Sequence, residues 1–199
     1  MRIVFLDTET TGLEPGQICQ LSYIVQEGNN LIKRVNQFFK VDYVDLGATK
    51  VNGLTKDMLD TLSKGKVFAD RAAEFFEDFN GSLLVAHNIN FDLKFIKAEF
   101  SRVGIDADFK HKLCTLTFLT DKIKLPGKYG GYKWPNVAES LKFLGFTEKE
   151  VSEFAKDIYG DHTGMAHDAR YDATAVCLMV NKMIGTGMLN IESYLLPKE

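Results

Sequence analysis

The fold is decided by the stretch Ile3-Val4-Phe5-Leu6-Asp7-Thr8-Glu9-Thr10-Thr11-Gly12. Residues 3–6 have the length and the β-branched, aromatic composition of a buried central strand, and Thr11-Gly12 supplies turn chemistry just beyond it. Two acids, Asp7 and Glu9, therefore stand at the exit of the predicted strand. Because residues two apart in an extended chain share a face, we expect their carboxylates side by side over the sheet edge.

The paired carboxylates of Asp7 and Glu9 need a compensating charge. Two carboxylates about 5 Å apart repel by about 3 kcal/mol at an effective dielectric of ~20. A hard divalent ion such as Mg²⁺ or Mn²⁺ prefers carboxylate oxygens and removes this repulsion. Since Asp-x-Glu also occurs in solvated turns, the pair alone leaves a surface turn as the alternative. The metal hypothesis therefore depends on partners further along the chain.

Composition limits the class of protein. A chain of 199 residues fits one domain, here residues 1–199, and its 45% hydrophobic and 26% charged residues are typical of soluble globular proteins. We expect no membrane partner and a cytoplasmic location, because no apolar segment reaches bilayer length and the start lacks a secretory signal. The cysteines, Cys19, Cys114 and Cys177, lack CxxC spacing and are expected to be buried free thiols.

Strand-like and helix-like segments follow one another in an α/β order. Residues 18–26 and 31–41 read as strands joined by a turn at 27–30, which makes an antiparallel meander with the first strand. Further short strands are predicted over 82–86 and 112–115. Helices are predicted over 55–62, 67–79, a segment ending near 103, 116–123, 137–144, 148–159 and 165–183. A helix followed by a buried strand is the order of elements that is typical of α/β proteins.

Acids also follow later elements. Asp92 comes just after the predicted strand 82–86, where helix capping is the ordinary role of an aspartate. Asp168 and Asp172 lie four residues apart on the last predicted helix and share a face, so spacing does not choose between them. A histidine alone, such as His167, is more often a surface residue than a catalyst. Ligand crevices of open α/β sheets lie beyond strand ends, however, which is where several of these acids are expected.

Three motifs together resemble those of the DEDDh 3′→5′ exonucleases, a family that includes proofreading subunits of bacterial replicative polymerases. The motifs are Asp7-Thr8-Glu9-Thr10-Thr11-Gly12, Ala86-His87-Asn88 with Phe91-Asp92, and His167-Asp168-Ala169-Arg170-Tyr171-Asp172. Each motif is weak alone. Their order, with a histidine five residues before the final aspartate, is specific, and the resemblance covers the chain from residue 2 to about residue 180.

The resemblance implies a fold and a metal centre. The fold would be a ribonuclease H-like mixed five-stranded sheet with an antiparallel second strand, flanked by helices. Two Mg²⁺ or Mn²⁺ ions would be held by Asp7, Glu9, Asp92 and Asp172, with His167 as general base. In such two-metal sites one ion activates a water and the other stabilises the leaving oxygen. Histidine suits the base role because its ordinary pKa lies near neutral pH.

The resemblance also implies nucleotide contacts. These would come from Thr8, Thr10, Thr11, Gly12, Leu13, Asn52 and Asn88. Leu13 matches a position that wedges against the terminal base in relatives. Asn52 departs from the family pattern, which often has histidine there, and this weakens the expected contact. An enzyme directed to 3′ ends needs little base readout.

A basic segment lies outside the three motifs. Residues 122–134 interleave lysines with Tyr129, Tyr132 and Trp134 in a glycine-rich loop, a combination that holds phosphates and stacks bases. The alternative is a solvated loop anchored by Trp134. The overall net charge of −3 argues against broad non-specific adhesion to nucleic acid.

The leading hypothesis is a metal-dependent exonuclease that releases nucleoside 5′-monophosphates from single-stranded or frayed DNA 3′ ends. Its partners would be 3′-terminal nucleic acid and, as a candidate, a DNA polymerase subunit. An RNA exonuclease or oligoribonuclease is the alternative within enzymes, because discrimination depends on contacts to the 2′-OH. A non-catalytic module that recruits a polymerase is the alternative from another class.

Overall fold

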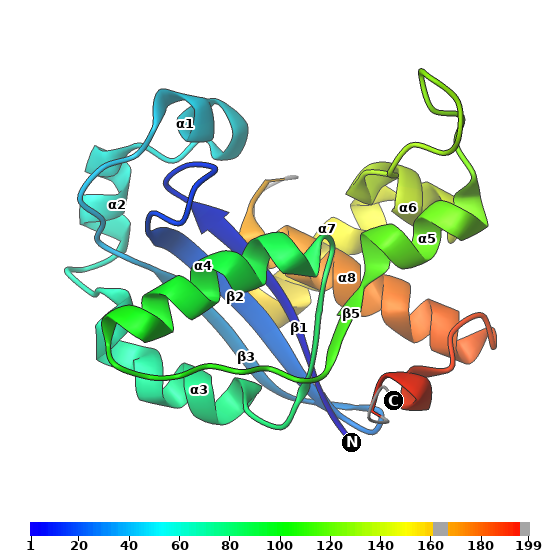
Figure 1. The fold of residues 1–199 in the computed structure, drawn as a ribbon, viewed down its shortest axis with the longest axis horizontal. Helices are drawn as coiled ribbons and strands as arrows, with labels where there is room; N and C mark the ends of the chain where they lie inside the picture. Colours follow the sequence, from blue (N-terminus) through cyan, green and yellow to red (C-terminus); the bar gives the residue numbers. More distant parts are fainter. Residues whose placement is uncertain (161–166, 196–199) are drawn as a thin grey trace.

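The structure is a computed structural model that describes residues 1–160 and 167–195. Its sheet consists of β1 Arg2–Thr10, β2 Ile18–Glu27, β3 Asn30–Phe38, β4 Leu83–Ala86 and β5 Lys112–Cys114. The helices are α1 Leu46–Asn52, α2 Lys56–Leu62, α3 Ala72–Phe79, α4 Ile89–Arg102, α5 Thr115–Ile123, α6 Val137–Phe143, α7 Glu148–Tyr159 and α8 Ala169–Gly185, with 3₁₀ turns at Phe68–Arg71 and Ile191–Tyr194. Figure 1 shows α3 and α4 on one side of the sheet and α7 and α8 on the other.

The five strands form one mixed sheet in the order β3-β2-β1-β4-β5. β2 is antiparallel to both β1 and β3, whereas β4 is parallel to β1 and β5. The expectation of a five-stranded α/β sheet with an antiparallel second strand is therefore confirmed. Because β1 and β4 run parallel, the segments that follow them emerge at the same edge of the sheet.

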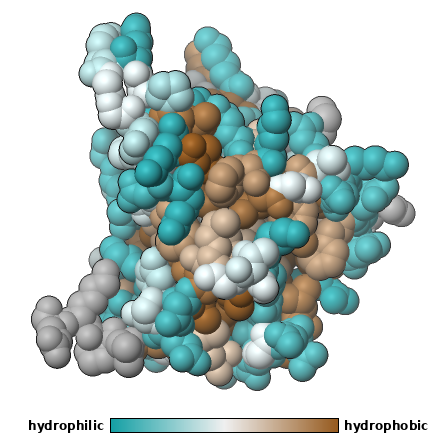
Figure 2. All heavy atoms as spheres, turned by 90° about the vertical axis from the view of Figure 1, so that its right-hand side faces the viewer, coloured by the Kyte–Doolittle hydropathy of each residue, from teal (hydrophilic) through white to brown (hydrophobic). Residues whose placement is uncertain are grey.

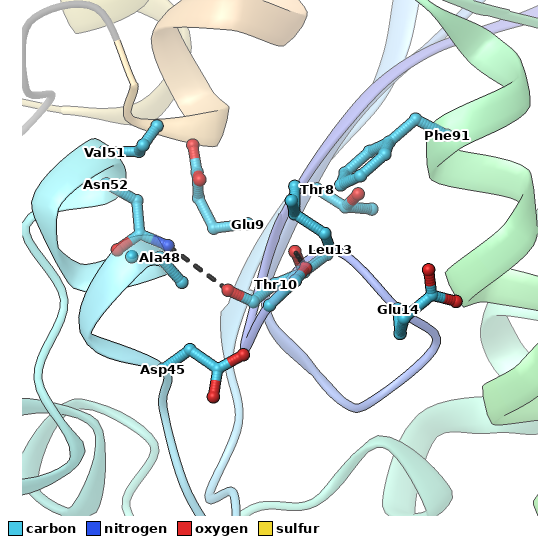
Figure 3. Close-up of a pocket in the computed structure, with 12 residues that line it drawn as sticks. Thr8, Glu9, Thr10, Leu13, Glu14, Asp45, Ala48, Val51, Asn52 and Phe91 are labelled. Carbon is cyan, nitrogen blue, oxygen red and sulfur yellow. Dashed lines mark hydrogen bonds between the residues drawn. The ribbon is translucent and has the colours of Figure 1, made fainter.

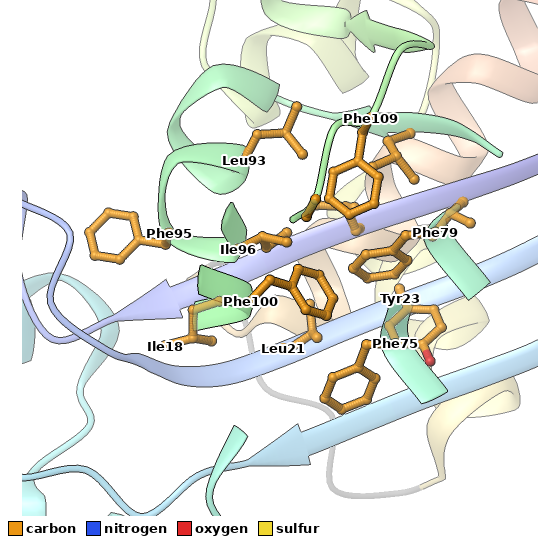
Figure 4. Close-up of a cluster of buried hydrophobic side chains, with 14 of the residues drawn as sticks. Ile18, Leu21, Tyr23, Phe75, Phe79, Leu93, Phe95, Ile96, Phe100 and Phe109 are labelled. Carbon is orange, nitrogen blue, oxygen red and sulfur yellow. The ribbon is translucent and has the colours of Figure 1, made fainter. Parts of the chain in front are cut away.

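The alternation of side chains along β1 builds two hydrophobic cores. Val4 and Leu6 face a cluster with α3 and α4, in which Tyr23, Phe79 and Phe100 pack edge to face (Figure 4). Ile3 and Phe5 face a second cluster with α5 to α8. Since β1 is buried from both sides, the position of every residue on it is tightly determined.

The first strand is longer than predicted. β1 continues to Thr10 because β2 pairs with it beyond the apolar run, with Asp7 opposite Ser22 and Glu9 opposite Gln20. The acids therefore lie within the strand, not beyond its end. On the other side, the register with β4 stops at Phe5 opposite Val85. The parallel half of the sheet thus ends where the acids begin, which opens space beside Asp7 and Glu9.

Three helices differ from the prediction. The helix expected over 67–79 is divided into a 3₁₀ turn at Phe68–Arg71 and α3 Ala72–Phe79. α1 was not expected; it occupies the segment before Gly53, which ends it with a left-handed φ of +72°. α8 begins at Ala169 and not near residue 165, because Asp168 is its N-cap and accepts a hydrogen bond from the Arg170 N–H. Residue 165 itself lies outside the described residues. By contrast, α7 has the predicted bounds, and Thr55 caps α2 as expected.

Two smaller expectations concern cysteines and membranes. Cys19 and Cys177 are buried free thiols, as predicted, and Cys114 is a free thiol that is only half-buried. No helix among the described residues combines the length and apolar character needed to span a bilayer.

Candidate active site

Three carboxylates from two elements converge beside the central strand. Asp7 and Glu9 come from β1, and Asp172 comes from the first turn of α8, which packs against the sheet through Phe5 and Val176. One oxygen from each of the three carboxylates lies within 4.8 Å of the others. Groups 165 residues apart in the sequence thus form one cluster of acidic oxygens.

Asp92 lies outside this tight group of three and lines the same pocket. It stands in the first turn of α4, directly after β4, and only 3% of its surface is exposed. Its Oδ1 accepts hydrogen bonds from the Thr8 backbone N–H at 3.0 Å and from the Thr8 hydroxyl at 2.9 Å. Thr8 therefore fixes the orientation of Asp92 from the strand that carries Asp7 and Glu9.

The pocket around these acids has a volume of about 470 Å³. Its lining includes the four predicted metal ligands and His167, together with His87, Asn88 and Trp134. Asn88 precedes α4 in a left-handed conformation, with a φ of +78°. His167 has a similar φ of +70°. Two non-glycine residues with left-handed backbones thus border one pocket, and such strained backbone tends to gather at functional sites.

Burial raises the pKa of every acid in the pocket. Burial, followed by the Asp172 charge, raises the pKa of Asp7 well above its ordinary value and that of Glu9 to about 9. Burial raises the pKa of Asp92 to about 7 and that of Asp172 to about 6. Shared burial of like charges is costly without a cation. All-oxygen, carboxylate-rich donors suit a hard divalent ion, so these residues fit the predicted metal centre.

The structure separates the two aspartates that spacing left equivalent. Asp172 joins Asp7 and Glu9, whereas Asp168 accepts hydrogen bonds from the side chains of Arg170 and Gln20. The side chain of Arg170 also lies over the ring of Phe38. Asp168 is therefore held against the sheet by its own neighbours, while Asp172 faces the pocket.

A second pocket of about 560 Å³ adjoins the first and shares Thr8, Glu9 and Phe91 with it. Figure 3 shows its labelled residues around a hollow between the β1 turn, α1 and α4. Of the predicted nucleotide-binding residues, it is lined by Thr8, Thr10, Gly12, Leu13 and Asn52. Leu13, 80% exposed, and the rings and methyls of Phe91, Val51 and Ala48 give it an apolar wall.

Two predicted nucleotide-binding residues, Thr11 and Asn52, form hydrogen bonds within the chain. Thr11 is fully buried and lines neither pocket; its hydroxyl accepts a hydrogen bond from the Gln17 N–H at 3.0 Å. Asn52 is engaged within the chain, because its side chain accepts from Leu54 and donates to the Thr10 carbonyl. A hydrogen bond from Asn52 also opposes the rise in the pKa of Glu9. Asn52 thus supports an acid of the first pocket while it lines the second.

Sequence reasoning missed part of the lining. Three apolar residues of the second pocket were not identified: Phe91, Val51 and Ala48. Their residue type does not indicate a binding role, since apolar residues on a helix are interpreted as core. His87 was quoted only as part of a motif, yet its ring nitrogens contact the Thr115 hydroxyl and the Pro135 carbonyl, each at 2.9 Å. It therefore connects the end of β4 to the segment that carries Trp134.

The protein-family model described as "Exonuclease" matches residues 4–180. The chain belongs to this exonuclease family. The match includes all of the acids in the pocket, so the motif-based resemblance to 3′→5′ exonucleases is confirmed at the level of the family.

Named relatives of this exonuclease chain include larger proteins. The chain is 29% identical over 145 residues to the "3′-5′ exonuclease DinG" of Bacillus subtilis, covering 71% of this chain and 15% of that protein. It is 35% identical over 98 residues to the DNA polymerase III subunit epsilon of Treponema pallidum, covering 48% and 44% of the two chains. The exonuclease chain thus spans less than half the length of either relative.

Solved structures share the fold of this exonuclease chain. E. coli exonuclease I in complex with a dA16 oligonucleotide superposes with a TM-score of 0.68 and 18% identity, over 92% of this chain and 41% of that one. Exonuclease X in complex with 5′ overhanging duplex DNA gives a TM-score of 0.61 at 18% identity, over 98% and 96%. At these identities the likeness establishes the fold, which is ribonuclease H-like.

Proposed function

We propose that the chain is a metal-dependent 3′→5′ exonuclease that hydrolyses the terminal phosphodiester of single-stranded or frayed DNA and releases nucleoside 5′-monophosphates. The observation that carries the proposal is the approach of Asp7, Glu9 and Asp172 oxygens within 4.8 Å, in a pocket that also contains Asp92 and His167. Family membership supports exonuclease activity, and the name of the DinG relative supports degradation in the 3′→5′ direction.

Asp7, Glu9, Asp92 and Asp172 would hold two divalent cations, Mg²⁺ or Mn²⁺. When bound, such ions supply an activated water and stabilise charge on the leaving 3′ oxygen. The carboxylates hold the cations only in their ionised form, so binding releases the protons that burial retains on them. Thr8 keeps one oxygen of Asp92 occupied and thereby orients the other.

His167 would accept the proton from the attacking water. It lines the pocket beside Asp172, and its side chain is exposed, so a proton taken by the ring passes readily to solvent. Its backbone N–H donates a hydrogen bond to Asp172, which ties this residue to a proposed metal ligand. Histidine exchanges protons at neutral pH, as a general base in water activation requires.

The second pocket would seat the terminal nucleotide. Its apolar wall of Leu13, Val51 and Phe91 suits a nucleobase, and Thr8 and Thr10 on β1 connect it to the acids. The wall offers few polar groups, which fits an enzyme that tolerates any base at the 3′ end.

The test is digestion of a 5′-labelled single strand with Mn²⁺. A ladder of products shortened from the 3′ end is expected, and EDTA should abolish it. Asp7→Asn removes one ligand charge with little change of shape and should reduce the rate at least about 100-fold, by analogy with lost charge stabilisation. Asp57→Asn, an exposed acid of α2, is the matched control and should cleave normally. An unchanged ladder from Asp7→Asn would remove the acids from the mechanism.

The same assay tests whether the substrate is DNA or RNA. Matched DNA and RNA strands, digested side by side, should show faster cleavage of DNA; preference for RNA would replace the DNA assignment with the oligoribonuclease alternative. A DNA polymerase remains the proposed partner, supported by the epsilon-subunit relatives. Co-elution of the purified chain with a replicative polymerase subunit in gel filtration is the corresponding test, and separate elution would contradict it.

A further inference from the structure

A short hairpin, residues 125–133, projects between α5 and α6; we call it the arm. In Figure 1 it is the yellow-green loop that rises above these two helices. The Lys133 N–H donates to the Leu125 carbonyl at 2.9 Å, and the Gly127 N–H donates to the Gly131 carbonyl at 3.0 Å. A Cβ at Gly127 would approach the Gly130 carbonyl oxygen to 2.7 Å. The arm therefore has a defined, hydrogen-bonded shape that its glycines permit.

The base of the arm is joined to the pocket of the acids. Pro135, two residues beyond the arm, accepts a hydrogen bond from His87 Nε2 at the end of β4. Asn136 then caps α6, whose Glu139 pairs with Lys133. Trp134, between arm and cap, lines the pocket that contains Asp7 and His167. The arm is thus anchored at its C-terminal root, and its aromatic base forms part of the pocket wall.

The arm exposes aromatic rings among lysines. Tyr129 is 92% exposed, Tyr132 51% and Trp134 69%. The Lys128 ammonium lies 5.2 Å from the centre of the Tyr129 ring, and that of Lys124 lies 5.8 Å from the Tyr132 ring. Figure 2 shows the side of the molecule that carries α5 and α6, where hydrophilic side chains surround a hydrophobic centre and extend onto the projection at the top.

Charge on the arm opposes that of the whole chain. Residues 122–138 contain no acid and four lysines, three of them besides the Lys133 that pairs with Glu139, although the net charge of the protein is −3. The folded chain thus offers a local positive surface that begins at the pocket and leads away from it. Positive charge interleaved with exposed aromatic rings binds phosphates and stacks unpaired bases, without preference for sequence.

We propose that the arm, together with the flanking residues Lys124 and Trp134, binds single-stranded nucleic acid upstream of the 3′ end that enters the pocket, with bases stacked on Tyr129, Tyr132 and Trp134 and phosphates near Lys124 and Lys128. The direction of the strand rests on the proposed function. A single strand is the occupant because its base faces are free to stack, whereas those of a duplex are covered by neighbouring base pairs.

Trp134 is the only tryptophan of the chain and lies between the arm and the pocket, so its fluorescence reports on nucleic acid bound at the root of the arm. Binding of dT20 is measured by Trp134 fluorescence in EDTA, where no metal-dependent hydrolysis occurs. Quenching that saturates below about 100 µM dT20 is expected, the range of electrostatic nucleic-acid binding at moderate salt. An abasic 20-mer has the same charge without bases and should bind at least about fivefold more weakly.

Variants separate the two contributions of the arm. Tyr129→Ser with Tyr132→Ser should weaken dT20 binding at least about fivefold per ring and reduce the preference for dT20 over the abasic strand to the part that Trp134 provides. Lys124→Gln with Lys128→Gln should lower the slope of log Kd against log salt by roughly 0.7 per lost phosphate contact. Lys149→Gln, an exposed lysine of α7, is the control and should leave dT20 binding unchanged.

The outcomes distinguish the arm from the catalytic proposal. Absence of Trp134 quenching at 100 µM dT20, or unchanged dT20 binding by the tyrosine variant, overturns the role of the arm even if the chain digests oligonucleotides. Tighter, arm-dependent binding of a blunt duplex overturns the single-strand assignment. If dT20 binds as expected and no ladder forms with Mn²⁺, the exonuclease proposal fails and the binding role of the arm stands.

Discussion

The backbone N–H of His167 donates a hydrogen bond to Oδ2 of Asp172 at 3.0 Å. The residue proposed as general base is thereby held by a proposed metal ligand five positions later. His167 has a φ of +70°, a left-handed conformation that costs a non-glycine residue about 1–2 kcal/mol. The hydrogen bond to Asp172 offsets part of this cost, and His167 lines the pocket that contains Asp172.

His167→Asn should separate catalysis from folding. Asparagine tolerates the left-handed region better than other residues, so the backbone and the bond to Asp172 are expected to persist. Loss of the imidazole should lower kcat by about 10²- to 10⁴-fold, while the free energy of unfolding changes by less than about 1 kcal/mol. Cleavage rates and urea unfolding measure the two effects. Normal kcat in His167→Asn would exclude His167 as the base.

Without metal, the protein should lose stability as pH rises. The folded-state pKa of Glu9, about 9, lies above its ordinary value of 4.5, and burial raises the pKa of Asp7 as well. The native state therefore binds more protons than the unfolded state across this window. The stabilisation is fully present below about pH 4.5 and is lost by about pH 9. Urea unfolding in EDTA at several pH values measures it.

Glu9→Gln is the matched variant for that pH dependence. A neutral amide cannot ionise, so the variant should exceed the wild type in stability at pH 8.5 in EDTA by at least about 1.4 kcal/mol, the equivalent of one pKa unit. Added Mn²⁺ should make the wild type more stable than Glu9→Gln, because the ion binds and stabilises the site only where the Glu9 carboxylate is present. Equal slopes of stability against pH for both proteins would contradict the raised pKa of Glu9.

Thr8→Val should weaken metal binding without disturbing β1. Valine matches threonine in shape and suits a strand, and the Thr8 backbone N–H keeps its bond to Asp92. Loss of the hydroxyl bond frees one constraint on a proposed ligand and should raise the Mn²⁺ concentration for half-maximal activity about 10-fold or more. Activity at saturating Mn²⁺ should recover largely. An unchanged Mn²⁺ requirement would show that Asp92 needs no support from the hydroxyl.

Asp78→Ala should destabilise the fold away from the pocket. Asp78 is 3% exposed and accepts from Arg2 at 2.9 Å and from the Tyr23 hydroxyl at 2.5 Å, and Lys33 lies 2.6 Å away. Removal of this shared partner should cost about 3 kcal/mol of unfolding free energy, since the tyrosine loses its buried acceptor. Glu77→Ala, an exposed neighbour on α3, should change it by less than about 0.5 kcal/mol. Equal losses from both variants would argue against the network.

Much of the fold follows from local pattern. The apolar residues 3–6, the turn after β2 and the helical periodicity of α4 and α8 predict an α/β sheet, because side-chain period and turn chemistry are local properties. The sequence pattern does not predict α1, because its seven residues bury no side chain and so show no apolar periodicity. Local pattern also does not predict the full length of β1, since its last four residues are held in the strand by pairing with β2.

The amino-acid sequence alone identifies the acids and, through the order of three motifs, predicts the family and the sheet. The resemblance named Asp172 as a ligand, but its approach to Asp7 and Glu9 depends on how the elements pack. Asp168 and Asp172 appear equivalent at helical spacing, but Asp168 lies before the helix and binds Arg170 and Gln20, whereas Asp172 turns toward Asp7. The raised pKa values of these carboxylates likewise arise from burial, which depends on the packing of α8 and α4 against β1 and not on any single motif.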